Sequence, residues 1–259
     1  MPKHPEAELF RCSRCTHAFS RPDSISEPEA YSDSYYEEQH KRWFEHPNVE
    51  LFGRIADYIA KDASVLDVGC GRGDFLRFIR GIRPDLRLSG IDLSGTARGE
   101  GIRFIPGDIL STEIDERFDA VVSLAVIEHI SDVKEFVRRL RRLTKPRGIV
   151  VTMTLNDSSL LYALARAGRC VYVPLAFDRL YSKHHLHHFT PKSLRTVFTE
   201  AGFAIISDFD HDAPIEAMDI PVKNSAADAL LRSGLRVVWK AAQVTRRGYL
   251  QTIVCTVSG

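Results

Sequence analysis

The sequence has no apolar run of 18 residues and no secretory signal at its start, MPKHPEAELFRC. A membrane-spanning helix needs about 20 such residues, so we expect a soluble, cytoplasmic protein without stable membrane insertion. Of the five cysteines only Cys12 and Cys15 lie close together, which excludes a disulfide framework. The formal net charge is +1, so the overall charge does not indicate a nucleic-acid partner.

The chain is long enough for one large domain with insertions. Its 259 residues, 44% of them hydrophobic, can bury a substantial core. Residues 1–45 are polar, aromatic and irregular in pattern, which indicates an N-terminal appendage. The pattern becomes regular from about residue 46 and predicts a single domain over 46–259.

Short apolar runs rich in Val and Ile alternate with helical patterns through this domain. Such alternation predicts a doubly wound α/β fold with a seven-stranded, mostly parallel sheet. Ligands of such sheets bind beyond the carboxyl ends of the strands, so the loops there should carry the function. The expected strands are 64–69, 87–92, 103–108, 118–125, 148–154, 204–210 and 249–257.

The segment VLDVGCGRGDF places Gly69, Gly71 and Gly73 where a strand turns into a helix. Glycine lets the backbone approach a ligand closely, near a helix N-terminus. The dinucleotide fingerprint requires a glycine at the position of Asp74, so that match fails. A phosphate loop fails too, because no Gly-Lys-Ser/Thr follows. Asp67 precedes the glycines, and its carboxylate suits a cationic ligand better than a pyrophosphate.

This pattern resembles motif I of the class I S-adenosylmethionine-dependent methyltransferases. The segments that follow resemble the later motifs of that family and come in the same order, over residues 50–155. In that family an acid at the position of Asp92 holds the ribose hydroxyls, and one at Asp108 contacts the adenine amino group. The resemblance implies a Rossmann-like methyltransferase fold with S-adenosylmethionine as cofactor. The cofactor-binding residues that it implies are Asp67, Gly69, Cys70, Gly71, Gly73, Asp92, Leu93, Asp108, Ile109, Leu124 and Tyr36.

The segment KHHLHHFTPKSL has four histidines within five positions. It resembles a segment of the ubiquinone-biosynthesis-type O-methyltransferases, in which His185 and His188 fall on histidines of the family. Either could deprotonate an acceptor hydroxyl or amine, because imidazole titrates near neutral pH. His129, in IEHI, is a third candidate base. A packing role for these histidines stays open, and we expect no metal because no carboxylates accompany them.

The pair Cys12-x-x-Cys15 is half of a tetrahedral zinc site. Some relatives carry a zinc ribbon here, followed by a Tyr-rich link similar to YSDSYYEEQH. We expect a degenerate knuckle that binds no metal. The RRLRRL motif of the helix expected over 131–143 is interpreted as a solvated basic face.

Helix-like inserts over about 156–182 and 211–248 are expected to form a lid and an acceptor pocket. The alternative is that they pack on the sheet or pair two subunits as a homodimer. The sequence therefore predicts a methyltransferase that acts on a small-molecule acceptor, by O-methylation of a lipid-, quinone- or sugar-type metabolite. Two other readings stay open: an RNA base methyltransferase with a zinc knuckle, and a non-catalytic cofactor-binding scaffold.

Overall fold

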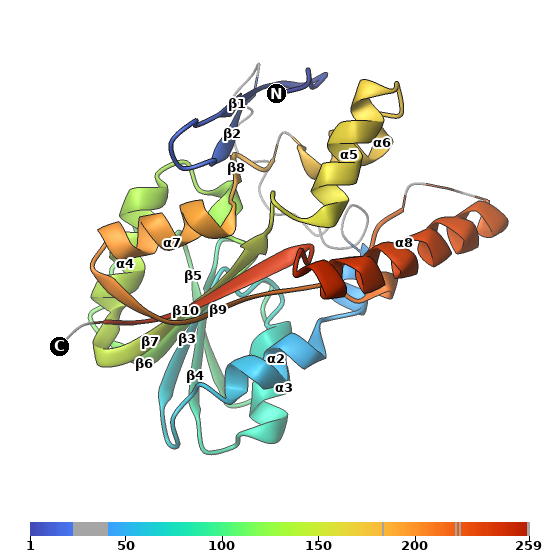
Figure 1. The fold of residues 1–259 in the computed structure, drawn as a ribbon. Helices are drawn as coiled ribbons and strands as arrows, with labels where there is room; N and C mark the ends of the chain where they lie inside the picture. Colours follow the sequence, from blue (N-terminus) through green and yellow to red (C-terminus); the bar gives the residue numbers. More distant parts are fainter. Residues whose placement is uncertain (23–40, 183, 221, 223, 258–259) are drawn as a thin grey trace.

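The computed structural model describes residues 1–22, 41–182, 184–220, 222 and 224–257. Seven strands form its central sheet in the order β5-β4-β3-β6-β7-β10-β9 (Figure 1). All neighbouring strands are parallel except β10, which runs antiparallel to β7 and β9. This confirms the predicted doubly wound α/β fold. The strands are β3 Ser64–Val68, β4 Arg87–Asp92, β5 Ile102–Pro106, β6 Phe118–Leu124, β7 Thr144–Leu155, β9 Phe203–His211 and β10 Leu250–Val257.

Helices cover both faces of the sheet, and each group of helices buries its own apolar core (Figure 1). Ile55, Leu76 and Trp239 belong to one core, and Phe136 and Phe198 to the other. Two separate cores explain why the strands read as continuous apolar runs, since both of their faces are buried. The first core includes residues of α2 Val49–Ala56, α3 Asp74–Ile82 and α8 Ser225–Thr245, and the second includes residues of α4 Val133–Leu143 and α7 Pro191–Glu200.

Helix α7 begins and ends where its sequence predicts. The Thr190 side chain accepts a hydrogen bond from the backbone N–H of Ser193, whose hydroxyl bonds back to Thr190 in a capping box. Pro191 occupies the first turn, where its missing N–H costs nothing. Gly202 follows the helix with φ +82°, a left-handed conformation that glycine adopts without strain.

The N-terminal segment is more regular than its sequence suggested. Strands β1 (Ala7–Arg11) and β2 (Ala18–Pro22) form an antiparallel hairpin, and β8 (His187–His188) adds a third strand beside β2. His17 and His187 are hydrogen-bonded across this small sheet although 170 residues separate them in sequence. A pairing so distant leaves no local pattern in the sequence, so the hairpin could not be expected from residues 1–22 alone.

The two predicted inserts occupy different places. Residues 156–182 form α5 (Leu160–Cys170) and α6 (Leu175–Leu180), which pack on each other beside the N-terminal hairpin (Figure 1). Residues 211–248 form the short 3-10 helix η3 (Ile215–Ala217) and the long α8. Neither α8 nor any other helix in the described part of the chain is long and apolar enough to cross a membrane.

A buried carboxylate ties the hairpin to the first insert. Asp157 is 1% exposed and forms ion pairs with Arg11 of β1 at 2.6 Å and with Arg166 of α5 at 3.1 Å. Tyr181 donates its hydroxyl to the same carboxylate and accepts a hydrogen bond from Arg166. A charge this deeply buried is tolerated only because several donors surround it.

Replacing Asp157 by alanine is expected to lower the free energy of unfolding by about 3 kcal/mol, because it leaves two half-buried guanidinium groups without their counter-charge. Chemical denaturation measures this loss. Asp115→Ala, which removes an exposed carboxylate, is the matched control and is expected to change stability by less than about 0.5 kcal/mol. Equal stability of the two variants would contradict the assignment of Asp157 as a structural anchor.

Candidate active site

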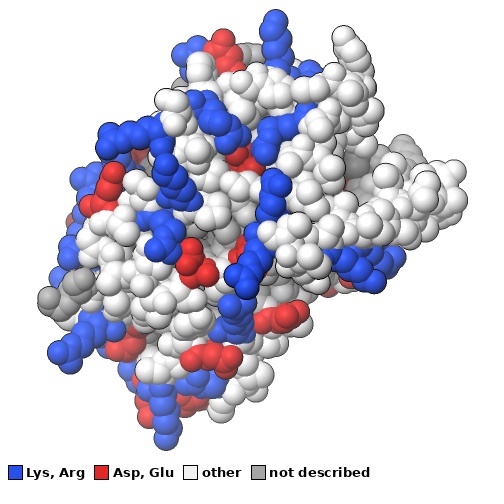
Figure 2. Space-filling model, viewed as in Figure 1, with Lys and Arg blue, Asp and Glu red and all other residues white. Residues whose placement is uncertain are grey.

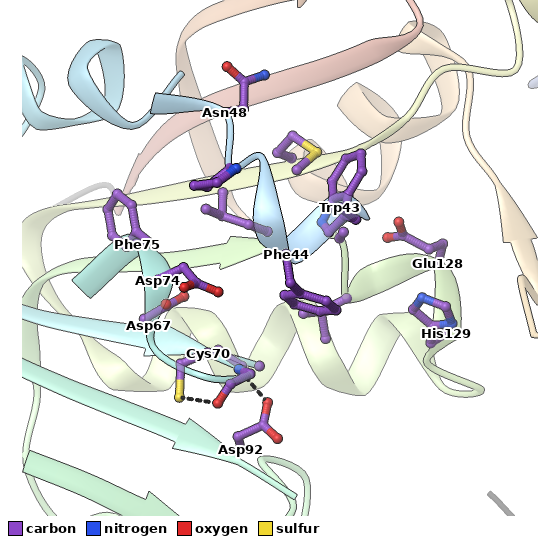
Figure 3. Close-up of a pocket in the computed structure, with 18 of the residues that line it drawn as sticks. Trp43, Phe44, Asn48, Asp67, Cys70, Asp74, Phe75, Asp92, Glu128 and His129 are labelled. Carbon is purple, nitrogen blue, oxygen red and sulfur yellow. Dashed lines mark hydrogen bonds between the residues drawn. The ribbon is translucent and has the colours of Figure 1, made fainter. Parts of the chain in front are cut away.

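A cavity of about 470 Å³ opens at the carboxyl ends of β3, β4, β5 and β6 (Figure 3). The strand order reverses at this edge, because β3 lies between β4 and β6 in the sheet. Doubly wound sheets bind their ligands at such a switch point. The volume lies within the range of roughly 300–1,000 Å³ that small-molecule sites occupy. The cavity therefore has the place and the size of a ligand site.

The glycine loop between β3 and α3 forms one wall of the cavity. Gly69, Gly71 and Gly73 have φ angles of +72°, +52° and +84°, in the left-handed region that other residues rarely adopt. At Gly69 a Cβ atom would lie 2.3 Å from Cγ2 of Val126, so no side chain fits there. Gly69 and Gly71 line the cavity, whereas Gly73 lies behind it as the N-cap of α3.

Two carboxylates project from the ends of neighbouring strands. Asp92, at the end of β4, accepts hydrogen bonds from the Gly71 N–H at 2.8 Å and from the Ser94 N–H and hydroxyl at 2.8 and 2.7 Å. Asp108 follows β5 and accepts a hydrogen bond from the Leu110 N–H at 2.9 Å. Both residues line the cavity. Their oxygens are therefore held in fixed directions on one side of the glycine loop.

A third carboxyl group lies beneath the loop. Asp67, in β3, is 2% exposed, and burial raises its pKa to about 8, with further contributions from the negative charges of Asp92 and Asp74 (Figure 3). The carboxylates of Asp92 and Asp108 make this wall negative, which favours a cationic ligand and disfavours a pyrophosphate. A bound cation would in turn favour the ionised form of Asp67.

Helix α1 (Lys41–Glu45) covers the cavity opposite the glycine loop. Trp43 and Phe44 both line the cavity (Figure 3). Arg72 of the glycine loop holds this helix in place: its guanidinium donates to the Phe44 carbonyl oxygen at 3.2 Å and lies 5.2 Å from the Phe44 ring centre. Tyr36, the residue of this part of the chain that was expected to contact the cofactor, lies outside the described residues.

Two of the three candidate bases lie together in the wall after β6. His129, in η2 (Ile127–His129), and His185 both line the cavity, with ring centres 5.0 Å apart. The Nδ1 atom of His129 lies 2.8 Å from the His184 carbonyl oxygen, and that of His185 lies 3.3 Å from the Leu180 carbonyl oxygen. A carbonyl oxygen only accepts, so Nδ1 is the donor to this oxygen in each ring.

Glu128 is a site residue that sequence analysis missed. It is 1% exposed, lines the cavity and accepts a hydrogen bond from the Thr154 hydroxyl at 2.8 Å. Burial raises its pKa, and the nearby His185 partly offsets that rise. Its signal in the sequence is a glutamate that follows the apolar run LAVI, at the end of a buried strand.

His188, the remaining candidate base, lies elsewhere. It is fully buried beside Tyr181, its Nε2 shares a hydrogen bond with the Ser20 hydroxyl at 2.8 Å, and it is not among the residues that line the cavity. Burial holds its pKa well below the usual range, so the ring stays neutral. These contacts favour the packing role that the sequence left open.

Of the residues expected to hold a cofactor, the structure brings nine to the cavity and places Gly73 behind it. Among the described residues, the lining includes Pro214 and Ala217 from the second insert but none from the first. The described residues also contain no group of three or more His, Cys, Asp or Glu placed to hold a metal. The nine are Asp67, Gly69, Cys70, Gly71, Asp92, Leu93, Asp108, Ile109 and Leu124.

Comparison with curated proteins finds ubiquinone biosynthesis O-methyltransferases. That of Rhodopseudomonas palustris is 38% identical over 114 residues, which cover 40% of this chain and 44% of the relative. That of Azorhizobium caulinodans is 32% identical over 160 residues, or 55% of this chain and 59% of the relative. The chain thus aligns with about half the length of these relatives.

Comparison with solved structures finds the same fold. The 1,6-didemethyltoxoflavin N1-methyltransferase of Burkholderia thailandensis, solved with S-adenosylhomocysteine, has a TM-score of 0.60 at 14% identity, over 98% of this chain and all of that one. An S-adenosylmethionine-dependent methyltransferase of Archaeoglobus fulgidus has a TM-score of 0.56 at 18% identity, over 86% and 98% of the two chains.

A family model described as a methyltransferase domain matches residues 36–208, which span the glycine loop, both strand-end carboxylates and the histidine segment. The residues present fit the cofactor of that family: a backbone of left-handed glycines, two oriented carboxylates and a negative wall surround a cavity of suitable size. The chain belongs to the methyltransferase-domain family, and the residues of its cavity fit S-adenosylmethionine as the methyl donor.

Proposed function

We propose that this enzyme methylates a hydroxyl group of a partly apolar small molecule of lipid-, quinone- or sugar-derived type. The observation that carries the proposal is the wall formed by Glu128, His129 and His185, which places imidazole nitrogens beside aromatic and aliphatic side chains of the same cavity. Trp43 and Tyr249 are among those apolar groups. The curated relatives named above, which act in ubiquinone biosynthesis, support oxygen as the acceptor atom.

The residues divide into two groups along the cavity. Asp92 would hold the ribose hydroxyls of the cofactor, Asp108 the adenine, and the backbone of Gly69 and Gly71 would lie against its amino-acid part, beside Asp67. When bound, S-adenosylmethionine supplies an electrophilic methyl group on a cationic sulfur. The protein's contribution to the transfer is alignment of the acceptor and a path for its proton.

That path begins at an imidazole. With Nδ1 held by a carbonyl oxygen, Nε2 of His185 or His129 accepts the proton of the acceptor hydroxyl. Glu128 lies close enough to His185 for their charges to interact, so it stabilises the imidazolium whenever its carboxyl group is ionised. Helix α1 keeps water from this part of the cavity by placing Trp43 and Phe44 over it.

Calorimetry followed by a transfer assay tests the proposal. We expect the protein to bind S-adenosylmethionine and to transfer its isotopically labelled methyl group to a hydroxyl compound when it is screened against fractionated metabolites. The site of the label, read by mass spectrometry, decides the acceptor atom. A label found only on nitrogen or carbon would overturn O-methylation while leaving the enzyme class intact.

Cofactor binding is expected to depend on pH through Asp67. Its pKa of about 8 in the folded protein exceeds the usual carboxyl value, so the group is protonated at neutral pH. A cationic ligand favours the carboxylate, so binding below pH 8 should release a proton and affinity should rise with pH, by up to about tenfold per unit, until pH 8. Calorimetry at pH 6.5, 7.5 and 8.5 in buffers of different ionisation enthalpy measures both effects.

The same shift has a consequence for the ligand-free protein. The pKa of Asp67 is higher in the folded protein than in the unfolded chain. Its contribution to the free energy of unfolding is therefore fully present below the pKa of the unfolded chain and is lost as the pH rises through about 8. The control is Asp67→Asn, which leaves the ligand's own titration unchanged and should remove both pH effects. If Asp67→Asn and the wild type showed the same pH dependence of affinity, the role given to Asp67 would be wrong.

A further inference from the structure

Helix α8 has two faces of different character. It spans 21 residues, and in Figure 1 its N-terminal half extends past the edge of the sheet. The inner face is held by Arg232, Trp239 and Ala242, which are buried. Arg232 donates to the carbonyl oxygens of Ile215 and Met218, so this face is fixed against the segment that contains η3.

The outer face carries a regular apolar stripe. Leu230, Val237 and Val244 recur every seven residues and are 73%, 67% and 86% exposed. A spacing of seven places them along one line of an α-helix. Small residues lie between them at the alternate positions of the same repeat: Ala227, Gly234 and Ala241. We call these six residues the α8 seam.

Gly234 is unusual in this position. A glycine inside a helix costs about 1 kcal/mol relative to alanine. Its Cβ would meet nothing within 4 Å, so no contact within the described chain explains it. A glycine between large apolar side chains leaves an open notch, and such a notch allows a second helix to approach closely.

The charges of α8 lie beside the seam or behind it. Asp228 and Arg232 pair with each other, and Arg236 lies 4.0 Å from Glu216. Lys240 is exposed and is the one other charged residue of the helix, on the flank of the seam. In Figure 2 the projecting arm formed by α8 is white over the side in view, with blue only along its border. The seam therefore suits an apolar partner of similar shape, and it lacks the basic face that an anionic surface would require.

We propose that the α8 seam joins two copies of this chain as an antiparallel helix pair. A two-fold axis that passes between residues 235 and 236 pairs every large residue of the seam with a small residue of the other copy. It places Leu230 against Ala241 of the partner subunit, Val237 against the partner's Gly234, and Val244 against the partner's Ala227. Large side chains then fill the notches beside small ones along the whole contact, as ridges fit grooves in closely packed helices.

The area is sufficient for a specific contact. A helix of 21 residues is about 31 Å long and about 10 Å across, so half of its surface amounts to roughly 500 Å². Two copies would bury about 1,000 Å² in total, the lower bound for a specific protein–protein interface. A heterologous partner would not need the self-complementary order of large and small residues, which favours a second copy.

The interface would also brace the active site. The segment that α8 holds includes Pro214 and Ala217, which line the cavity. Trp239 donates its indole N–H to the Ala213 carbonyl oxygen at 2.8 Å, which ties the helix to this part of the wall. The inference does not depend on the identity of the acceptor.

Sedimentation velocity of the intact protein over a wide concentration range tests association. We expect a dimer, and we expect Val237→Glu to weaken it at least about a hundredfold, because the contact would bury two unpaired carboxylates. Gly234→Leu fills the notch and should also weaken the dimer, although it raises helix propensity and so leaves the fold intact. Val171→Glu, at a residue 68% exposed between α5 and α6, is the matched control and should leave the dimer unchanged.

Disulfide trapping tests the register. The background for this test has Cys12, Cys15 and Cys170 replaced by serine. In it Val237→Cys should cross-link under mild oxidation, because the two copies of residue 237 are offset by only about 4.5 Å along the helix axis. Val244→Cys should not, because its two copies lie about 26 Å apart. A monomer at every concentration, loss of the dimer in Val171→Glu alone, or efficient trapping through residue 244 would each overturn the proposal.

Discussion

Replacing Gly71 by valine is expected to weaken binding of S-adenosylmethionine more than about a hundredfold. Gly71 has φ +52°, which a β-branched residue adopts only with strain of about 1–3 kcal/mol. Its N–H also donates to Asp92 at 2.8 Å, so a shift of this backbone would displace the carboxylate placed to hold the ribose. The added side chain would stand in a wall of the cavity. Calorimetric titration with the cofactor measures the loss.

The control must separate the site from the fold. Gly81→Val introduces the same side chain into α3 at an exposed position where a Cβ meets nothing within 4 Å, and binding should stay within twofold of wild type. Gly71→Ala is a milder second variant with an expected loss of about tenfold, because strain remains while the added volume is small. Thermal unfolding followed by circular dichroism verifies that each variant is folded. Wild-type affinity in folded Gly71→Val would refute the cofactor site.

The parts of this site that follow from local sequence were predictable. The glycine loop is a single segment, and Asp92 and Asp108 each end an apolar run, so parallel pairing brings them to the same edge of the sheet. Helix α7 was predictable for the same reason, since Thr190 and Gly202 mark its ends. In each case the residues that determine the structure lie within a few positions of one another.

Other parts depend on contacts between distant segments. Nothing local indicates that His187 pairs with the N-terminal hairpin, and that pairing decides which histidines reach the cavity. Adjacent residues of a strand point to opposite sides, so His187 and His188 cannot share one environment. His188 is buried, whereas His185 precedes β8 and faces the cavity. The resemblance marked His185 and His188 alike, and only the three-dimensional arrangement separates them.

His185→Ala is expected to lower turnover by about 10²- to 10⁴-fold while the affinity for S-adenosylmethionine stays within about twofold, because a general base acts on the acceptor and not on the cofactor. The measurement is transfer of labelled methyl to the acceptor, paired with calorimetry. His184→Ala is the matched control, since the side chain of this neighbouring histidine is exposed and the residue does not line the cavity. Recovery of His185→Ala activity by imidazole in the buffer is a readout that a purely structural role would not give.

His188→Ala should behave in the opposite way. Truncating a fully buried ring beside Tyr181 and leaving Ser20 without its partner is expected to lower stability by about 2–4 kcal/mol. Turnover of the fraction that stays folded should match wild type, because the ring lies outside the cavity. If His129→Ala lost turnover and recovered with imidazole while His185→Ala did neither, the base would be His129. If His188→Ala alone lost turnover at unchanged stability, His188 would not be a packing residue. The role in proton transfer proposed for His129 and His185 would then be wrong.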